Sequence, residues 1–271
     1  MAPHRLPADL LPPEGVLMER EVNVQVDDRV MVVTLNRPAV RNAVTQSVAE
    51  AVATALDELD ASDQLAVGVI TGAGGTFCAG RDLKASLQGD HPWIDNRGFA
   101  GIAEYGSIKP LIAAVEGYAL GGGFEIVLSC DLVVAARSAK FGLPEVQRGR
   151  IAGAGGLFRL PERVPYHVAM EIALTGEPVT ADRAAQFGLI NRVVDDGDAL
   201  DAALAVGRRI AVNGPLAVKA TKQVIQASRD WPAAEAFEQQ RPIADAVRAS
   251  EDAREGARAF AEKRAPVWRN R

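Results

Sequence analysis

The chain has 271 residues, of which 48% are hydrophobic and 24% charged, and its formal net charge is −5. This length allows one large domain or two small ones with a sizeable core. The acidic balance argues against a nucleic-acid surface, because phosphate binding needs a basic face. No window reaches the roughly 18 uninterrupted apolar residues of a membrane span. The prolines and charges near the N-terminus interrupt the apolar run that a signal peptide needs. We therefore expect a cytoplasmic protein that binds neither nucleic acid nor membrane.

Cysteines and histidines point away from metal and redox chemistry. The chain has two cysteines, Cys78 and Cys130, in unrelated contexts, so no disulfide framework or CxxC metal motif can be built. Each is expected to be a small buried hydrophobe. The three histidines are scattered and never four residues apart, so we expect no histidine metal site and no Cys/His or Ser/His pair.

Hydrophobic periodicity predicts an α/β part followed by a helical part. β-branched and apolar runs predict strands over residues 17–26, 30–36, 66–71, 111–115, 132–135 and 190–194. Helical periodicity predicts helices over 46–61, up to about 107, after the central glycines, and over 199–211, 215–228, 232–249 and 251–263. Asp27-Asp28 marks a hairpin, Thr45 is the expected N-cap of the helix at 46–61, and residues 87–99 read as a mobile polar loop.

Two glycine clusters, at residues 72–75 and 153–156, invite a dinucleotide-binding interpretation. The spacing does not support it, because the third glycine of G-x-G-x-x-G would fall at Phe77 in one case and at Phe158 in the other. No G-x-x-x-x-G-K-[ST] motif occurs either. Nucleotide-dependent redox and kinase chemistry are therefore not expected.

A third glycine cluster, Gly121-Gly122-Gly123, stands between a predicted strand and a predicted helix. Glycines at a helix start leave N–H groups open towards an anion or an oxyanion that forms during reaction. The alternative is that the glycines only allow close packing of a turn. A second turn, residues 76–84, also follows a strand and contains a glycine, so it could present another free N–H. One N–H from each turn would make a two-donor oxyanion hole.

Two carboxylates stand out by their apolar surroundings. Glu125 lies just past the glycine turn, and Glu145 follows Pro144 at the end of an apolar segment. A carboxylate in an apolar stretch costs free energy unless it is paired or protonated. Two such groups that share one water could act as base and acid. Helix N-terminal electrostatics for Glu125 and a surface turn for Glu145 are the alternatives.

At these residues the chain resembles the crotonase superfamily, the enoyl-CoA hydratases and isomerases, over nearly its whole length. The matching pieces are LNRP with NA (35–38, 42–43), FCAGRDLK (77–84), KPLIAAVEGYALGGGFE (109–125), FGLPE (141–145), GAGG-x-x-R-L (153–160), LTGEPVTADRAAQFGLINRVV (174–194) and AFAEKR (259–264). Within the family, the segments at 98–125 and 250–271 look most like the carnitinyl-CoA dehydratase branch.

The resemblance implies a crotonase-like (ClpP/crotonase) α/β fold, a spiral of ββα units. Residues 1–195 would form the core with the catalytic site, and residues 196–271 a helical trimerisation region. It implies that the Arg81 and Gly122 N–H groups polarise a thioester carbonyl. Glu125 would help activate water and Glu145 would exchange the α-proton. No metal or redox cofactor is implied, since CoA is part of the substrate.

By the same resemblance, CoA contacts are expected at Ala79, Arg81, Asp82, Leu83, Lys84, Phe260 and Lys263, the last two reaching CoA on a neighbouring subunit. Arg81 and Lys84 can equally be solvated charges, and Lys263 a solvated helix end. The expected assembly is a homotrimer or a dimer of trimers. The expected reaction is reversible hydration of a 2-enoyl-CoA. The alternatives are carnitinyl-CoA dehydratase specifically, an enoyl-CoA isomerase that needs only Glu145, or a non-catalytic acyl-CoA-binding protein. Arg81 stands where many hydratases have a small residue, which leaves the acyl group open.

Overall fold

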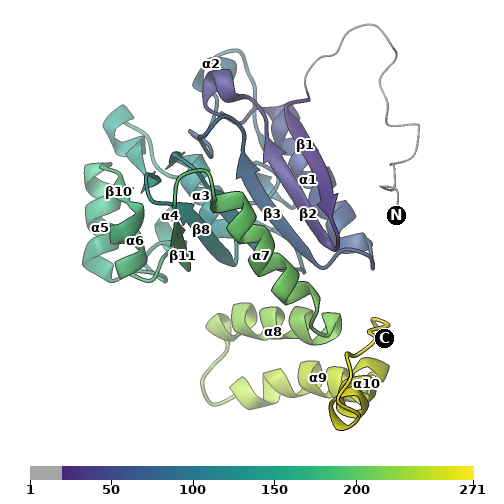
Figure 1. The fold of residues 1–271 in the computed structure, drawn as a ribbon. Coiled ribbons are helices and arrows are strands. Elements are labelled where there is room, and N and C mark those ends of the chain that lie inside the picture. Colours follow the sequence, from purple (N-terminus) through teal and green to yellow (C-terminus); the bar gives the residue numbers. More distant parts are fainter. Residues whose placement is uncertain (1–19) are drawn as a thin grey trace, which may run out of the picture.

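The computed structural model describes residues 20–271, and its centre is a six-stranded sheet (Figure 1). The strand order is β1-β2-β3-β6-β8-β11. The strands are β1 (Val22–Asp27), β2 (Val30–Leu35), β3 (Val67–Gly72), β6 (Leu111–Val115), β8 (Leu132–Ala136) and β11 (Arg192–Val194). Only β1 and β2 pair antiparallel, and every other neighbouring pair is parallel. The hairpin predicted around Asp27-Asp28 is therefore confirmed, with residues 17–19 of its first predicted strand outside the described part.

A smaller three-stranded sheet lies beside the main one, in the order β10 (Val179–Thr180), β9 (Lys140–Gly142) and β7 (Tyr118–Leu120). The chain runs from main-sheet β6 to small-sheet β7 and then into helix α3 (Gly122–Ser129). It next runs from β8 to β9 and into the 3-10 helix η3 (Pro144–Arg148). This repeated strand-strand-helix path is the expected spiral of ββα units, and the predicted fold class is confirmed.

The two faces of the main sheet are covered by different helices, because successive side chains of a strand point to opposite faces. Val30 and Val32 pack with α7 (Ala199–Ala211), which Figure 1 shows crossing the sheet. Met31 and Val33 face the other side, where α1 (Gln46–Ala61) adds its apolar stripe to the main core.

The N-terminus of α7 is capped by Glu116, the residue after β6. Its carboxylate accepts hydrogen bonds from the Gly197 and Ala199 N–H groups, each at 3.1 Å.

Helix α1 has the bounds that the sequence predicts. Thr45 is its N-cap, with its hydroxyl accepting from the Val48 N–H at 3.5 Å. The far end is held by Lys109, whose ammonium donates to the carbonyls of Leu59, Ser62 and Leu65 at 2.6–2.9 Å. The last carbonyls of a helix have no partner within it, so this buried cation satisfies groups that the helix itself cannot.

The segment between 87 and 107 differs from the prediction in two respects. Strands β4 (Trp93–Ile94) and β5 (Gly98–Phe99) pair as a small hairpin inside the expected loop. The prediction of a helix ending near residue 107 is wrong, since residues 100–104 form turns and bends and residues 105–107 have no regular structure. Arg97 provides the reason, because its guanidinium is close to Asp57 and donates to the Tyr105 and Gly106 carbonyls, giving this backbone partners other than helical ones.

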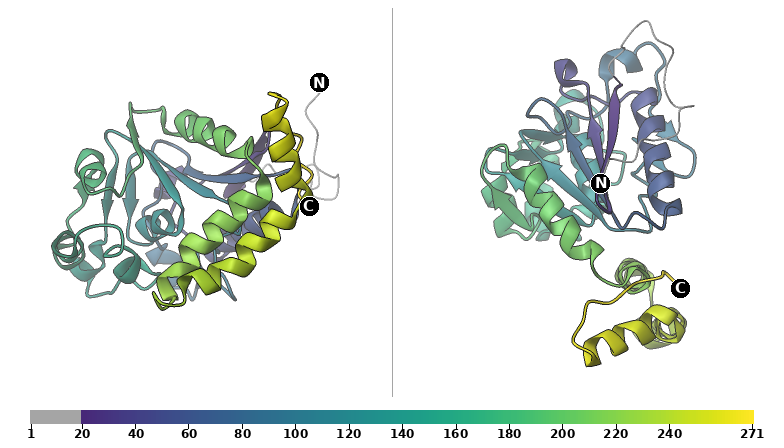
Figure 2. Two further views of the ribbon diagram at one scale, coloured as in Figure 1. Left: turned by 90° about the horizontal axis from the view of Figure 1, so that it is seen from below. Right: turned by 45° about the vertical axis from the view of Figure 1, so that its right-hand side comes forward.

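The remaining helices lie at two places. α2 (Leu83–Ser86), α4 (Gly156–Arg159), α5 (Tyr166–Thr175) and α6 (Ala181–Gln186) belong to the α/β part. α8 (Pro215–Ala227), α9 (Ala236–Ala249) and α10 (Glu251–Ala261) form a C-terminal arm that stands away from the sheets (Figures 1 and 2). Neither α8 nor α9 has a buried residue in the single chain. In the described part of the chain, no helix has both the length and the apolar character to cross a membrane.

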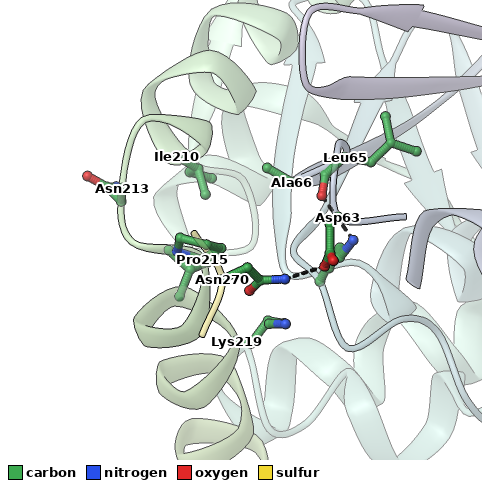
Figure 3. A pocket seen from close by; sticks show the side chains of 10 residues that line it. Asp63, Leu65, Ala66, Ile210, Asn213, Pro215, Lys219 and Asn270 are labelled. Carbon is green, nitrogen blue, oxygen red and sulfur yellow. Dashed lines mark hydrogen bonds between the residues drawn. The ribbon is translucent and has the colours of Figure 1, made fainter. Parts of the chain in front are cut away.

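The arm is attached to the α/β part through polar contacts. Lys222 on α8 donates to the Asp131 carboxylate at 2.6 Å and to the Lys109 carbonyl at 2.8 Å. Near the C-terminus, the Asn270 amide donates to Asp63, at the edge of a small pocket between the arm and the loop after α1 (Figure 3). Asp252 accepts from the Arg269 and Asn270 N–H groups, which fixes the last residues against α10.

Replacing Lys109 by Met is expected to lower the free energy of unfolding by about 1–3 kcal/mol, because buried carbonyls would lose a charged donor. Urea unfolding followed by circular dichroism measures the change. The matched control is Lys84→Met on exposed α2, for which a change within about 0.5 kcal/mol is expected. Equal stability of the two variants would contradict the capping role of Lys109.

Candidate active site

The central glycines form the N-terminal turn of α3. Gly121 has φ +55° and ψ −128°, a conformation open only to glycine, and a Cβ there would lie 2.9 Å from a carboxylate oxygen of Glu145. A Cβ at Gly123 would lie 2.1 Å from the Cys78 carbonyl oxygen. The first N–H groups of a helix have no partner within it. Among the described residues, no backbone carbonyl accepts from the Gly122 N–H.

The second predicted turn lies directly against the first. Cys78 and Ala119 form an isolated parallel β-bridge. The Cys78 N–H donates to the Tyr118 carbonyl, and the Cys78 carbonyl accepts from the Leu120 N–H. Gly80, at φ +92°, comes so close that a Cβ on it would be 2.9 Å from the Gly122 nitrogen. The next N–H, that of Arg81, also donates to no backbone carbonyl in the described part. The two N–H groups expected to polarise a carbonyl thus come from two turns in contact.

Glu125 lies on the first turn of α3, with 3% of its surface exposed. Its Oε1 accepts from the Ala154 N–H at 2.7 Å and from the Gly156 N–H at 2.9 Å. Burial raises the pKa of this carboxyl, although the two N–H donors and the charge of Arg159 oppose the rise. Oε2 accepts from no group in the described part of the chain, so it is the oxygen left for a ligand.

Arg159 fixes the loop at residues 154–156, which donates the hydrogen bonds to Glu125. Its guanidinium donates to the Ala154 carbonyl at 3.2 Å, to the Ser129 hydroxyl at 3.3 Å and to the Ala103 carbonyl at 2.5 Å. Sequence reasoning did not assign this role to Arg159, nor the two N–H donors to Glu125. The signal was the segment at 153–160, whose glycines and arginine fit the family pattern but give no indication in sequence of a contact with Glu125. Gly156 leaves the space, since a Cβ there would be 3.1 Å from the Glu125 side chain.

Glu145 is the second residue of η3, directly after Pro144, and its carboxylate lies close to Gly121 of the glycine turn. Its Oε2 is buried and, among the described groups, has no hydrogen-bond partner. Burial raises the pKa of the Glu145 carboxyl and the nearby charge of Glu125 adds to the rise, although the residue's own N–H and the charge of Arg148 oppose it. A buried carboxylate oxygen without a donor is costly when ionised, so this carboxyl favours its protonated form.

The two glutamates differ in the hydrogen bonds that their carboxyls receive. Both pKa values are raised, but only Glu125 has N–H donors from a neighbouring loop that favour its ionised form. Two coupled carboxyls titrate as a pair, and the two loop donors favour the ionised form of Glu125 within it. Two carboxyls with raised pKa values thus lie around the same glycine turn.

The β4–β5 hairpin contacts this turn through Phe99. The Phe99 ring lies so near Gly122 that a Cβ on the glycine would be 2.5 Å from it. Trp93 packs edge-on against Phe99, with ring centroids 5.1 Å apart. The Arg81 side chain turns to the same hairpin, donating to the Asp90 carbonyl at 2.8 Å and lying over the Trp93 ring. The segment expected as a mobile loop is thus a wall of the site.

The residues expected to contact CoA fall into two groups. Ala79, Arg81, Asp82, Leu83 and Lys84 run from the second turn into α2, where Leu83 and Lys84 are exposed. The Asp82 carboxylate caps α2 through the Lys84 and Ala85 N–H groups and accepts from Arg37 at 3.1 Å. Phe260 and Lys263 lie at the end of α10, and Phe260 is 88% exposed. Figure 1 shows α2 and α10 at opposite ends of the molecule, so the two groups do not meet within one chain.

Neither cysteine is poised for reaction. Both are buried free thiols, and burial raises the pKa of each to about 12. In residues 20–271, no group of three or more His, Cys, Asp or Glu side chains is arranged to hold a metal ion. The groups that the chain presents at the glycine turn are two N–H donors and two carboxyls.

Comparison with known proteins connects this geometry to a family. Residues 25–271 match the family model described as enoyl-CoA hydratase/isomerase. The chain is 42% identical to "Enoyl-CoA hydratase EchA19" of Mycobacterium tuberculosis over 89% of this chain and 93% of the relative. It is 37% identical to a carnitinyl-CoA dehydratase of Salmonella enteritidis over 94% of this chain and 100% of the relative.

A solved structure agrees with these matches. The crystal structure of an enoyl-CoA hydratase from Mycobacterium tuberculosis H37Rv superposes with a TM-score of 0.92 at 51% identity, covering 93% of this chain and 100% of that one. The family match covers both turns, both glutamates and the C-terminal arm. The chain belongs to the enoyl-CoA hydratase/isomerase family.

Proposed function

We propose that this protein adds water reversibly to the double bond of a 2-enoyl-CoA thioester. The family implies an acyl-CoA thioester as the substrate, and relatives named enoyl-CoA hydratase support hydration. The observation that carries the proposal is that the buried carboxyl of Glu125 and the half-buried carboxyl of Glu145 lie around a turn with a free N–H group. Isomerisation needs only one of them, so the presence of both favours hydration.

The glycine turn supplies the electrostatic part of the mechanism. Attack of water on the β-carbon moves electron density onto the thioester oxygen, which becomes an enolate oxygen. The N–H groups of Arg81 and Gly122 would donate to that oxygen, and α3 directs its N-terminus towards it. Each donor of such a hole contributes about 3–4 kcal/mol of transition-state stabilisation. Because the turns are held by backbone contacts, the donors need no rearrangement when the charge forms.

The carboxyl pair supplies the proton transfers. Ionised Glu125 would accept a proton from water through its free Oε2 as the oxygen bonds to the β-carbon. Protonated Glu145 would deliver its proton to the α-carbon of the enolate. The substrate thereby gains OH at one carbon and H at the other, and the pair keeps one proton in total. Dehydration runs through the same groups in reverse.

The C-terminal arm supports an oligomer. α8 and α9 have no buried residue, and Ile225 and Phe237 are 61% and 83% exposed in the single chain. Apolar side chains of this size on amphipathic helices normally face a partner. We infer a homotrimer or a dimer of trimers. In it, residues 79–84 of one subunit bind most of the CoA, and Phe260 and Lys263 of a neighbouring subunit contact the same CoA. We also infer a cytoplasmic location, which two unpaired thiols support.

Glu145→Gln is expected to lower kcat for hydration by at least about 100-fold, because the amide cannot deliver a proton. The measurement is the loss of ultraviolet absorbance of crotonyl-CoA as its conjugated double bond is hydrated. Glu125→Gln is expected to fall by a similar factor, and Glu171→Gln on exposed α5 serves as the control. Unchanged turnover in Glu145→Gln would refute its role, and no turnover by the parent protein on enoyl-CoAs of any chain length would favour the acyl-CoA-binding alternative.

Arg159→Met is expected to move the rising limb of the pH profile of kcat/KM to higher pH. The Arg159 charge lowers the pKa of Glu125, so its removal raises that pKa, and Glu125 is then ionised only at higher pH. Arg159→Lys should restore part of the original profile, whereas Arg183→Met on α6 should leave it unchanged. A general loss of activity with no shift of the limb would show that Arg159 does not act through Glu125.

Light scattering of the full chain is expected to give the mass of a trimer or hexamer. Replacing Phe237 by Asp should dissociate the oligomer, because a charged carboxylate would stand in the interface where α9 now has an apolar ring. Gln239→Asp, with an exposed polar residue on the same helix, is the control. A monomer for the parent protein would exclude the assembly that we infer.

A further inference from the structure

The peptide between Gly80 and Arg81 is held by the segment just before α1. The Val44 N–H donates to the Gly80 carbonyl at 2.8 Å, and the Val44 carbonyl accepts from the Asp82 N–H at 2.9 Å. Val44 and Arg81 thereby form an isolated parallel β-bridge. The two hydrogen bonds use the groups on either side of Arg81, so its own N–H takes no part in them.

This bridge decides the direction of the Arg81 N–H. A peptide unit is planar, and in its trans form the C=O and N–H groups point in opposite directions. The described part of the chain has no cis peptide bond. The hydrogen bond from Val44 turns the Gly80 carbonyl towards residues 41–44, so the Arg81 N–H points away from them. The other neighbour of this turn is β7, which leads into the glycine turn.

The position of Val44 depends on Asn42, which is 1% exposed and has φ +55°. Asparagine adopts this left-handed conformation more readily than most residues. Its Oδ1 accepts from the Arg37 N–H at 2.8 Å. Its Nδ2 donates to the Ala73 carbonyl at 2.9 Å and to the Thr76 carbonyl at 2.6 Å. The side chain therefore ties the segment before α1 to the loop that follows β3.

The two segments that Asn42 ties together meet at the Arg81 peptide. Residues 43–44 lead to the N–H that holds the Gly80 carbonyl, and residues 73–76 continue into the turn itself. The Asn42 carbonyl also accepts from the Cys78 thiol at 3.1 Å. Without the amide, one buried N–H and two carbonyls would lose their partner, and the segments would no longer be fixed to each other. A backbone donor stabilises an oxyanion only when it is aimed at that oxygen.

We propose that Asn42 is a positioning residue of the oxyanion hole, which sets the direction of the Arg81 N–H through the Val44–Gly80 hydrogen bond. The inference rests on the proposed hydration and assigns a residue that acts on its transition state without touching the substrate. The Gly122 N–H belongs to the other turn, so the loss of Asn42 weakens the hole and leaves one of its donors in place.

The absorbance of a bound chromophore tests this role. Dimethylaminocinnamoyl-CoA has an enoyl thioester conjugated to an electron donor, so hydrogen bonds to its carbonyl move its absorbance to longer wavelength. The spectrum is recorded with all of the ligand bound, so that affinity does not enter. Asn42→Gly keeps the left-handed backbone and removes the amide. It should reduce the red shift and lower kcat for crotonyl-CoA hydration by at least about 10-fold.

Asn42→Asp is the conservative variant, and it decides the matter if Asn42→Gly does not fold. It keeps the shape of the side chain and the acceptor for the Arg37 N–H. Burial favours the protonated carboxyl, which can donate to one of the two carbonyls that the amide serves. Its red shift and kcat should therefore lie between those of the parent protein and Asn42→Gly.

Two controls separate the aim of the N–H from other effects. Asp28→Gly changes another residue with φ +55°, on the exposed β1–β2 hairpin, and should keep the parent red shift and kcat. Lys109→Met, which is expected to lower stability away from the turn, should keep the red shift as well. Parent values in both Asn42 variants would overturn the inference, and so would an equal loss of red shift in Lys109→Met. Absence of both hydration and a red shift in the parent protein would refute the proposed function, and the inference with it.

Discussion

The close approach of two turns, at Gly80 and Gly122, is the contact on which the rest of the site depends. A side chain on either glycine would collide with the other turn or with Phe99. Only this approach brings two N–H groups from different parts of the chain to one point, and each turn is fixed by its own strand. β3 leads into the first turn, and β6 and β7 lead into the second. The sheet therefore acts as the rigid base that sets the distance between the donors.

Around this point, the structure gives two similar residues different properties. Glu125 and Glu145 are both carboxyls in apolar surroundings, and burial raises both pKa values. The loop at 154–156 donates two N–H groups to one of them, whereas an oxygen of the other is buried without a donor. Two residues of the same type thus have different electrostatic surroundings, which is what the proposed base and acid require.

Much of the fold could be predicted because its signals are local. The bounds of α1, α7 and β6 follow from apolar periodicity, a capping threonine and glycine turns within a few residues. The helix expected before residue 107 did not form because Arg97 binds backbone carbonyls eight and nine residues away in sequence and contacts Asp57, forty residues away. β10 was missed because two residues carry no period, and its pairing with β9 exists only in the folded chain.

The sequence by itself determined which residue types were available: two glycine turns after strands, two carboxylates in apolar segments, and the motifs that relate the chain to its family. Only the tertiary structure decided how these residues are held. The Glu125 carboxylate binds N–H groups 29 and 31 residues away, and the Arg81 side chain turns to the hairpin rather than to solvent. Periodicity reports neighbours within a turn or two of helix, whereas the charge, protonation and direction of a side chain depend on groups that only folding brings near.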